Sequence, residues 1–449
     1  MPAVLRLIPE EVDTVEKRGN YTVSVIGCGK KGVLYAVAFA EAGYKVICAD
    51  ADQSLVRQLA RGKTLFSERD IEVKLKRFVR TGQLSTTSEV KNSVSQSDIV
   101  VITLVAKIDG RKNSDYSEVE SGCKQVGGAL HRGALVIYGG TAGFGFTESV
   151  VKEILENTSG FKVGEDFGLV YNPIQVSNGK AADISSQELT VAADDKTSLE
   201  AASLVLETVT KKSVKQVLSL KTAELAALFV VAKRDVNVAL ANELAVLCEN
   251  AGVDYFEALK LLVSSAGEGF IPTIAAEEGM DEAYLLLENA ENLGAKLRIT
   301  ALARQVNESV VKHVVSLVQG ALRGCGKTLR RARVAVLGPV GPNTMAETLV
   351  KLLEAKGAKV SIYDPLFIKR GVSDVPRVFR RSLNEAAEGA DCMVLLAETD
   401  QFNRLSLKKL RAVMRRPAAI VDLAGKLEFR KVEKAGFVYG GLGRGVEKK

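Results

Sequence analysis

One short segment constrains the fold of this chain more than any other. Residues 21–52 read as an apolar run, the glycine-containing turn GCGKKG, an alanine-rich amphipathic stretch, Gly43 and a second apolar run. Short apolar runs on either side of a stretch with helical periodicity are typical of a strand, a helix and a second strand, and glycine commonly ends a helix. The segment therefore predicts a βαβ unit, the building block of a parallel sheet covered by helices.

The rest of the chain divides by pattern. Its 449 residues suggest about three domains. Further strands are expected at 99–104, 134–138 and 167–171, and after 326 a second strand–turn–helix–strand unit begins, with strands at 392–396 and 418–422. Between these regions, residues 203–322 read as helix after helix. The prediction is an α/β protein with two Rossmann-like parallel-sheet domains joined by a helical central domain. The expected parts are an N-terminal extension (1–20), a Rossmann domain (21–205), a helical domain (206–325) and a second Rossmann-like domain (326–449).

The turn itself indicates a dinucleotide site. Its glycines are Gly27, Gly29 and Gly32. In this context they permit a tight turn, close approach of a pyrophosphate and close helix packing. Asp50 ends the second strand, where a carboxylate binds ribose hydroxyls and repels a 2′-phosphate, so we expect NAD rather than NADP. The alternative is that the glycines serve the turn alone. Lys30 and Lys31 either add charge beside the pyrophosphate or form a solvated helix start.

Composition excludes several classes of protein. The six cysteines are scattered without a CxxC pair, which indicates reduced thiols, and two histidines make a histidine-rich metal site unavailable. We expect no metal. No apolar run approaches a membrane span and the N-terminus has no signal-peptide core, so we expect a cytoplasmic protein. Acidic residues are interspersed with the basic ones, and the basic cluster at 323–333 lacks aromatic neighbours, so an exposed linker is favoured over nucleic-acid binding.

Several passages occur in an order typical of one family. They are VIGCGKKG with CADAD, SGFKVGEDFGLVYNP, RDVNVALANELAVLCENAGVD, ARQVNESVV and GFVYGGLGRG. Over about residues 20–445 the chain resembles the nucleotide-sugar 6-dehydrogenases, which include UDP-glucose, UDP-N-acetylmannosamine and GDP-mannose dehydrogenases. The resemblance implies an NAD site in the first domain, a nucleotide sugar in the last and a homodimer through the central helices. Family members oxidise a sugar C6 alcohol to an acid in two hydride transfers, with the intermediates held on a cysteine.

The family's catalytic side chains are only partly retained. The resemblance places Thr141, which is also expected in the cofactor site, and Asp281 at retained positions, where they position a water. At the other positions it places Ile174 for a glutamate, Ala227 for the oxyanion-binding lysine, Val231 for the asparagine and Glu277 for the cysteine. No cysteine lies between Cys248 and Cys325. Because each lost oxyanion donor costs ~2.7–4 kcal/mol and the covalent nucleophile is missing, we expect the family's two-step oxidation to be lost.

Three functions remain open. The favoured one is a non-catalytic relative that still binds NAD and works as a sensor, partner subunit or scaffold. An alternative is an active NAD-dependent nucleotide-sugar oxidoreductase of glycan-precursor synthesis, with a single oxidation and Glu277, Glu278 or Lys107 as its base. For the two glutamates a solvated acidic loop is the plainer interpretation. The third is a different two-electron oxidoreductase, resembling the 6-phosphogluconate and hydroxyacyl dehydrogenases.

Overall fold

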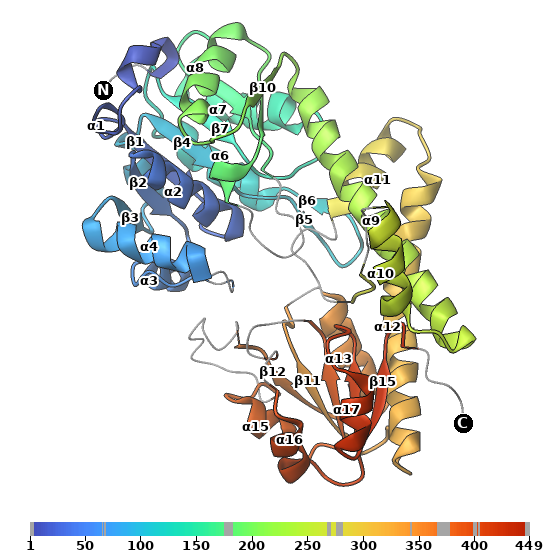
Figure 1. The fold of residues 1–449 in the computed structure, drawn as a ribbon. Coiled ribbons are helices and arrows are strands. Elements are labelled where there is room, and N and C mark those ends of the chain that lie inside the picture. Colours follow the sequence, from blue (N-terminus) through green and yellow to red (C-terminus); the bar gives the residue numbers. More distant parts are fainter. Residues whose placement is uncertain are drawn as a thin grey trace. The chain divides into compact units, whose positions relative to one another are not determined.

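The computed structural model separates the chain into two compact units, which are described one at a time. Unit 1 comprises Met1–Val231 and Tyr284–Ala295, and unit 2 comprises Ala232–Ala283 and Lys296–Lys449. The boundary falls inside the long helix α9 (Leu220–Ala251), which begins in unit 1 (Figure 1). The described residues are 4–64, 66, 69–174, 183–266, 271–274, 282–341, 344–365, 378–397, 402 and 405–444.

Unit 1 contains an eight-stranded sheet with the order β10-β9-β8-β7-β4-β1-β2-β3. Its strands are β1 (Thr22–Ile26), β2 (Lys45–Ala49), β3 (Leu84–Thr87), β4 (Ile99–Ile102), β7 (Leu135–Tyr138), β8 (Gly168–Tyr171), β9 (Leu189–Ala192) and β10 (Val214–Val217). Neighbouring strands are parallel except for β8 and β9. A separate two-stranded hairpin pairs β5 (Lys107–Ile108) with β6 (Ser114–Asp115). The parallel strands bring the ends of β1, β4 and β7 to one edge of the sheet.

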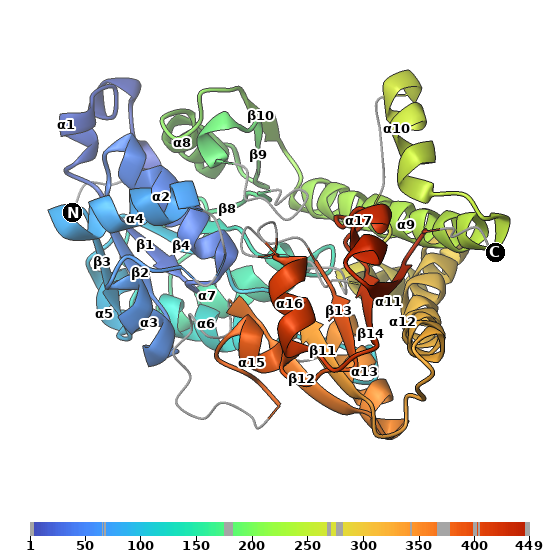
Figure 2. The same ribbon diagram turned by 60° about the horizontal axis from the view of Figure 1, so that its bottom comes forward.

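Helices cover both faces of this sheet. One face is packed by α2 (Lys30–Ala42), α3 (Gln53–Leu59), α4 (Arg69–Thr81) and α8 (Lys196–Glu207). The other is packed by α5 (Val90–Ser95), α6 (Ser117–Gly127), η3 (Thr147–Val151), α7 (Lys152–Ser159) and the start of α9 (Figure 2). The remaining short helices are η1 (Val4–Arg6), η2 (Pro9–Glu11), α1 (Val15–Arg18) and η4 (Ile184–Ser186), and α11 spans Ala283–Asn292. Two covered faces explain why the central strands β4, β7 and β8 are buried along their whole length rather than alternating between buried and exposed residues.

Unit 2 contains a five-stranded parallel sheet with the order β12-β11-β13-β14-β15. Its strands are β11 (Arg333–Leu337), β12 (Lys359–Tyr363), β13 (Cys392–Leu395), β14 (Ala418–Asp422) and β15 (Phe437–Gly441). One face is packed by α12 (Arg298–Gly324) and α13 (Met345–Ala355), and the other by α15 (Leu383–Ala387), α16 (Leu407–Val413) and α17 (Phe429–Lys434). Helix α10 (Tyr255–Ala266) follows α9. Among the described residues, no helix has the length and apolar character needed to cross a membrane.

The predicted fold class is confirmed, with two parallel-sheet Rossmann-like regions and a helical region between them in sequence. One expectation is wrong in part, because the stretch expected to be all-helical contains β10 (Val214–Val217), which joins the sheet of unit 1. This is a four-residue edge strand with no buried residue. It therefore lacks the apolar pattern by which buried strands are recognised.

Candidate functional site

The glycine turn of unit 1 has the geometry of a dinucleotide cradle. Gly27 follows β1 with a φ of +90°, a conformation that side chains rarely adopt. A Cβ on Gly32 would lie 1.9 Å from the Gly27 carbonyl oxygen, so only glycine allows α2 to pack this closely. A Cβ on Gly29 would meet no heavy atom within 4 Å, because this residue faces open space at the start of α2. The residues present therefore fit a pyrophosphate held against the start of a helix.

Asp50 lies beside this turn, directly after β2. Its carboxylate accepts a hydrogen bond from the backbone N–H of Cys28 at 2.6 Å and another from that of Asp52 at 2.9 Å. The two bonds fix the carboxylate at the end of β2, with acceptor capacity left for a ribose. The structure thus brings together Gly27, Gly29, Gly32 and Asp50 in the arrangement that the sequence predicts.

Thr141 lies on the other side of the turn, in the loop after β7. The Lys31 ammonium donates to its hydroxyl at 2.5 Å. Lys31 is half-buried and Thr141 is buried, so a solvated helix start does not describe Lys31. The neighbouring Lys30 instead has its ammonium 5.8 Å from the centre of the Phe66 ring. Sequence reasoning missed the contact between Lys31 and Thr141, because it depends on β7 and β1 lying close together in the sheet order.

Two further side chains hold the loop that carries Thr141, and the sequence did not indicate either. The Glu224 carboxylate accepts from the backbone N–H of Gly145 at 2.5 Å and of Thr147 at 2.8 Å. Burial raises the pKa of Glu224, while the hydrogen bonds from Thr147 and Gly145 oppose that rise. The Asn289 side-chain oxygen accepts from the Phe144 N–H at 2.9 Å. These residues have positioning roles within unit 1.

The other residues singled out by the sequence have different surroundings. Ile174 is buried in the core on the face of the sheet that α2 covers. Ala227, near the start of α9, packs against the core on the other face. Neither offers a polar group. Lys107 forms an ion pair with Glu118. The acidic residues predicted on the loop before α11, namely Glu277, Glu278 and Asp281, lie outside the described residues.

All six cysteines are among the described residues, and none forms a disulfide. Burial raises the pKa of Cys123 to about 12 and also raises the pKa of Cys248, Cys325 and Cys392. The pKa of Cys28 is raised by a hydrogen bond with Cys48 and by burial. These five thiols are therefore protonated near neutral pH, whereas a nucleophilic cysteine acts as the thiolate.

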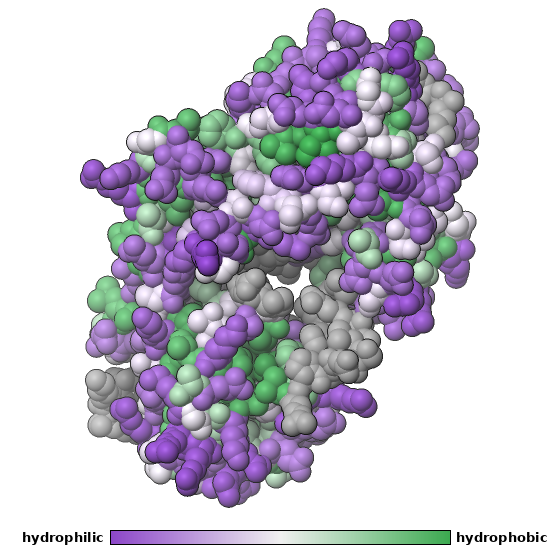
Figure 3. Space-filling model, turned by 180° about the vertical axis from the view of Figure 1, so that it is seen from behind, coloured by the Kyte–Doolittle hydropathy of each residue, from purple (hydrophilic) through white to green (hydrophobic). Residues whose placement is uncertain are grey.

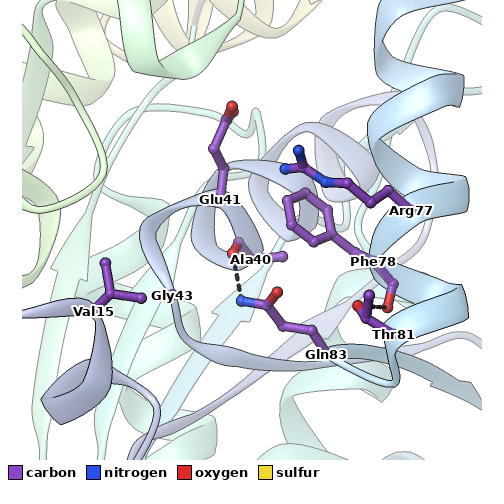
Figure 4. Close-up of a pocket in the computed structure, with 8 residues that line it drawn as sticks. All are labelled: Val15, Ala40, Glu41, Gly43, Arg77, Phe78, Thr81 and Gln83. Atoms are coloured by element: carbon purple, nitrogen blue, oxygen red, sulfur yellow. Dashed lines mark hydrogen bonds between the residues drawn. The ribbon is translucent and has the colours of Figure 1, made fainter.

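A shallow pocket of about 270 Å³ lies elsewhere in unit 1 (Figure 4). It is lined by Val15, Ala40, Glu41, Gly43, Arg77, Phe78, Thr81 and Gln83. The Gln83 amide donates to the Ala40 carbonyl at 2.6 Å, so part of its polar lining is already paired. Gly43 and Gln83 lie just before β2 and β3, at the amino ends of these parallel strands. The glycine turn instead follows the carboxyl end of β1. The pocket is thus at the opposite edge of the sheet from the candidate site.

Comparison with family models identifies three consecutive matches. Residues 21–219 match the NAD binding domain of the UDP-glucose/GDP-mannose dehydrogenase family, residues 221–309 its central domain, and residues 343–428 its UDP binding domain. The cradle described above lies within the first match. NAD is therefore the cofactor of this domain, as the sequence predicts.

Individual proteins of known name or structure are similar over nearly the whole chain. The UDP-N-acetyl-D-mannosamine dehydrogenase of Pyrococcus horikoshii is 28% identical, over 94% of this chain and 99% of the relative. The UDP-glucose 6-dehydrogenase TuaD of Bacillus subtilis is 24% identical, over 94% and 93%. The structure of UDP-D-ManNAc dehydrogenase from Pyrococcus horikoshii superposes with a TM-score of 0.79 at 27% identity, over 94% of this chain and 99% of the other. The NDP-N-acetyl-D-galactosaminuronic acid dehydrogenase of Methanosarcina mazei gives a TM-score of 0.70 at 27% identity, over 97% and 98%.

Proposed function

The chain belongs to the UDP-glucose/GDP-mannose dehydrogenase family. We propose that it is a non-catalytic member, which binds NAD and a nucleotide sugar but performs neither the cysteine-dependent oxidation of a sugar C6 alcohol nor a single-step oxidation. The observation that carries this proposal is the distribution of its cysteines. None occurs between Cys248 and Cys325, the region in which the family's nucleophile falls. The chain keeps the glycine turn of the cofactor cradle, but its sequence has no cysteine in the region where the resemblance places the group that carries the covalent intermediate.

The surroundings of the thiols support this proposal. Cys123, on α6, and Cys392, on β13, are fully buried, and burial raises the pKa of each. Cys248 is more accessible, but burial raises its pKa as well. A thiol that attacks a carbonyl needs a lowered pKa or an adjacent base. The surroundings of these three residues act in the opposite direction.

The replaced oxyanion donors point the same way. Ala227 and Val231, on the first part of α9, occupy the positions where the resemblance places a lysine and an asparagine. An aliphatic side chain cannot donate a hydrogen bond to a developing oxyanion. One lost donor lowers turnover by about 10²–10³-fold, so two losses leave little of the reaction. The protein keeps the binding part of the family's function, which suits a sensor or a partner subunit in the cytoplasm.

The decisive experiment combines binding and turnover. Calorimetric titration of the purified chain with NAD, and separately with UDP, should detect binding of both ligands. The same sample with NAD and UDP-N-acetyl-D-mannosamine or UDP-glucose should give no growth in absorbance at about 340 nm, the absorption band of reduced nicotinamide. The Pyrococcus horikoshii relative is the positive control. Growth of absorbance would contradict the proposal and favour the single-step oxidation, with Lys107 and Glu277 as the first residues to replace.

We also propose that the chain forms a homodimer through its helical region. In unit 2, α9 exposes Leu240, Leu244 and Leu247, which are spaced along one side of the helix, and α12 exposes Ile299 and Leu302. Seen from behind, the surface carries mainly hydrophilic residues, with hydrophobic residues gathered in several separate areas (Figure 3). Exposed leucines repeated along one helix are typical of a subunit contact.

The dimer is tested by light scattering after gel filtration. The wild-type chain should elute with the mass of a dimer, and Leu247→Glu, at a side chain that is 60% exposed, should shift it toward the monomer without changing its circular dichroism. Val73→Glu, at a residue 62% exposed on α4, is the matched control and should leave the mass unchanged. A monomeric wild type would reject this interface.

A further inference from the structure

The Lys31 side chain bridges two loops at the edge of the sheet where its parallel strands end. It starts in the first turn of α2 and reaches the Thr141 hydroxyl at 2.5 Å. Thr141 is itself fixed, because its carbonyl accepts from the Ala106 N–H at 3.0 Å and so ties the loop after β7 to the loop after β4. The ammonium is therefore fixed near the carboxyl ends of β1, β4 and β7 and does not extend freely into solvent.

This position lies on the side of the turn away from Asp50. The strand order places β2, which Asp50 follows, on one side of β1, and places β4 and β7 on the other. In folds of this kind the dinucleotide crosses the strand ends, with its pyrophosphate at the glycine turn and its adenosine ribose on the acidic residue after the second strand. The nicotinamide half accordingly extends toward β4 and β7, where Lys31 meets Thr141.

We propose that Lys31 discriminates between the two redox forms of the cofactor and makes this protein bind NADH more tightly than NAD⁺. The proposal rests on the proposed function, since it requires that the dinucleotide binds. The oxidised nicotinamide ring carries a positive charge and the reduced ring is neutral, so a fixed ammonium beside the ring repels only the oxidised form. Two like charges a few ångströms apart near a protein surface repel enough to change affinity by about tenfold or more.

Lys30 provides a matched control in the same turn. It carries the same charge, but its ammonium lies 5.8 Å from the centre of the Phe66 ring. Phe66 lies between α3 and α4, in the connection from β2 to β3 and thus on the adenosine side of the turn. A charge there is near the pyrophosphate and adenosine half, so its removal should weaken all dinucleotides by a similar factor.

The experiment measures dissociation constants of NAD⁺, NADH and ADP-ribose for the wild-type protein and for Lys31→Met and Lys30→Met. In the wild type, NADH should bind about tenfold more tightly than NAD⁺. Lys31→Met should remove most of that preference by improving the binding of NAD⁺, and it should leave ADP-ribose, which has no nicotinamide ring, within about twofold. Lys30→Met should keep the ratio of NADH to NAD⁺ affinity.

Three results would overturn the inference. One is equal affinity of the wild type for NAD⁺ and NADH, which needs no variant and so does not depend on how Lys31→Met folds. Another is an unchanged ratio in Lys31→Met, and the third is a large loss of ADP-ribose binding in that variant, which would assign Lys31 to the pyrophosphate instead. Failure of all three ligands to bind the wild type would reject the proposed function itself, which is a distinguishable outcome.

Discussion

The two parallel sheets begin with the same strand–turn–helix arrangement but differ in how tightly the turn is built. In unit 1, α2 starts at Lys30, directly after Gly29, and a Cβ on Gly32 would lie 1.9 Å from a backbone oxygen. In unit 2, α13 starts later, at Met345, and a Cβ on Gly341 would meet its nearest atom, a methyl group of Thr344, at 3.4 Å. Both turns open on a glycine with positive φ, Gly27 (+90°) and Gly338 (+134°), so what distinguishes the NAD-binding turn is the close packing of its helix at Gly32.

A second comparison concerns the aspartates that precede β4 and β13, the strands that pair with the first strand of each sheet on the side away from its second strand. The Asp98 carboxylate, before β4, accepts from the Thr22 N–H at 2.8 Å, and the Asp391 carboxylate, before β13, accepts from the Arg333 N–H at 2.9 Å. In unit 2 the Lys327 ammonium adds an ion pair at 2.7 Å. Burial raises the pKa of Asp98. For Asp391, burial acts in the same direction, but the Arg333 N–H and Lys327 outweigh it and the pKa is lowered.

The largest effect is expected from alanine in the two turns. Gly32→Ala must displace the Gly27 carbonyl or move α2, and we expect it to destabilise unit 1 by about 3 kcal/mol, near the upper end of overpacking costs. Gly341→Ala meets only a methyl group at van der Waals distance and should change stability by less than about 0.5 kcal/mol. Amide hydrogen exchange measures the stability of each unit separately, through the protection of β1 in unit 1 and of β11 in unit 2. Equal protection of β1 in wild type and Gly32→Ala would contradict the tight-turn argument.

A smaller effect, dependent on pH, is expected at the paired aspartates. Asp391→Asn removes a charge-assisted bond and should cost about 2 kcal/mol at pH 7. Because the pKa of Asp391 is lowered in the folded state, the stabilisation is complete above about pH 4, the pKa of an unfolded aspartate, and is lost as the pH falls further. The cost of Asp391→Asn should therefore shrink in acid.

Asp98→Asn should show the opposite trend. The raised pKa of Asp98 means that its ionisation destabilises unit 1 as the pH rises from about 4 through the folded pKa. The stability of Asp98→Asn relative to the wild type should therefore be highest at neutral pH. Exchange protection of β4 and β13, measured between about pH 3.5 and 7, distinguishes the two trends. If the stability change caused by each substitution varied with pH in the same way, the proposed difference between Asp98 and Asp391 would be wrong.

Local pattern is sufficient to predict the architecture, and it also singles out the glycine turn and Asp50 as candidate residues of the cofactor site. The glycine turn and Asp50 are recognisable because each needs only a short stretch of sequence with a fixed spacing. By contrast, β10 was missed because an edge strand with no buried side chain carries no apolar pattern. The Asp391–Lys327 ion pair likewise joins two elements 64 residues apart, and it uses a lysine of the cluster that pattern alone assigned to an exposed linker.

The nicotinamide side of the site likewise depends on contacts between residues far apart in the sequence, which local pattern does not predict. Lys31 and Thr141 are 110 residues apart, and their contact follows from β4 and β7 lying in order beside β1. Glu224 and Asn289 hold the loop after Thr141 from elements far along the chain, and nothing in their local sequence indicates that role. Glu277 and Asp281 lie outside the described residues, so their roles stay predictions.

An effect measured in ligand affinity rather than in stability is expected from the aspartates that follow the second strand of each sheet. Asp50→Ala removes the predicted ribose ligand and should weaken NAD binding by about 1–3 kcal/mol. Asp364 directly follows β12, and its carboxylate accepts a hydrogen bond from the backbone N–H of Val340 at 3.4 Å. Asp364→Ala should leave NAD affinity unchanged. Asp50→Asn keeps an acceptor for the Cys28 N–H but loses the charge that repels a 2′-phosphate, so it should narrow the preference for NAD over NADP. Calorimetric titration measures all three variants, and NAD affinity equal to wild type in Asp50→Ala would reject the assignment of Asp50 to the ribose and leave it as a support of the turn.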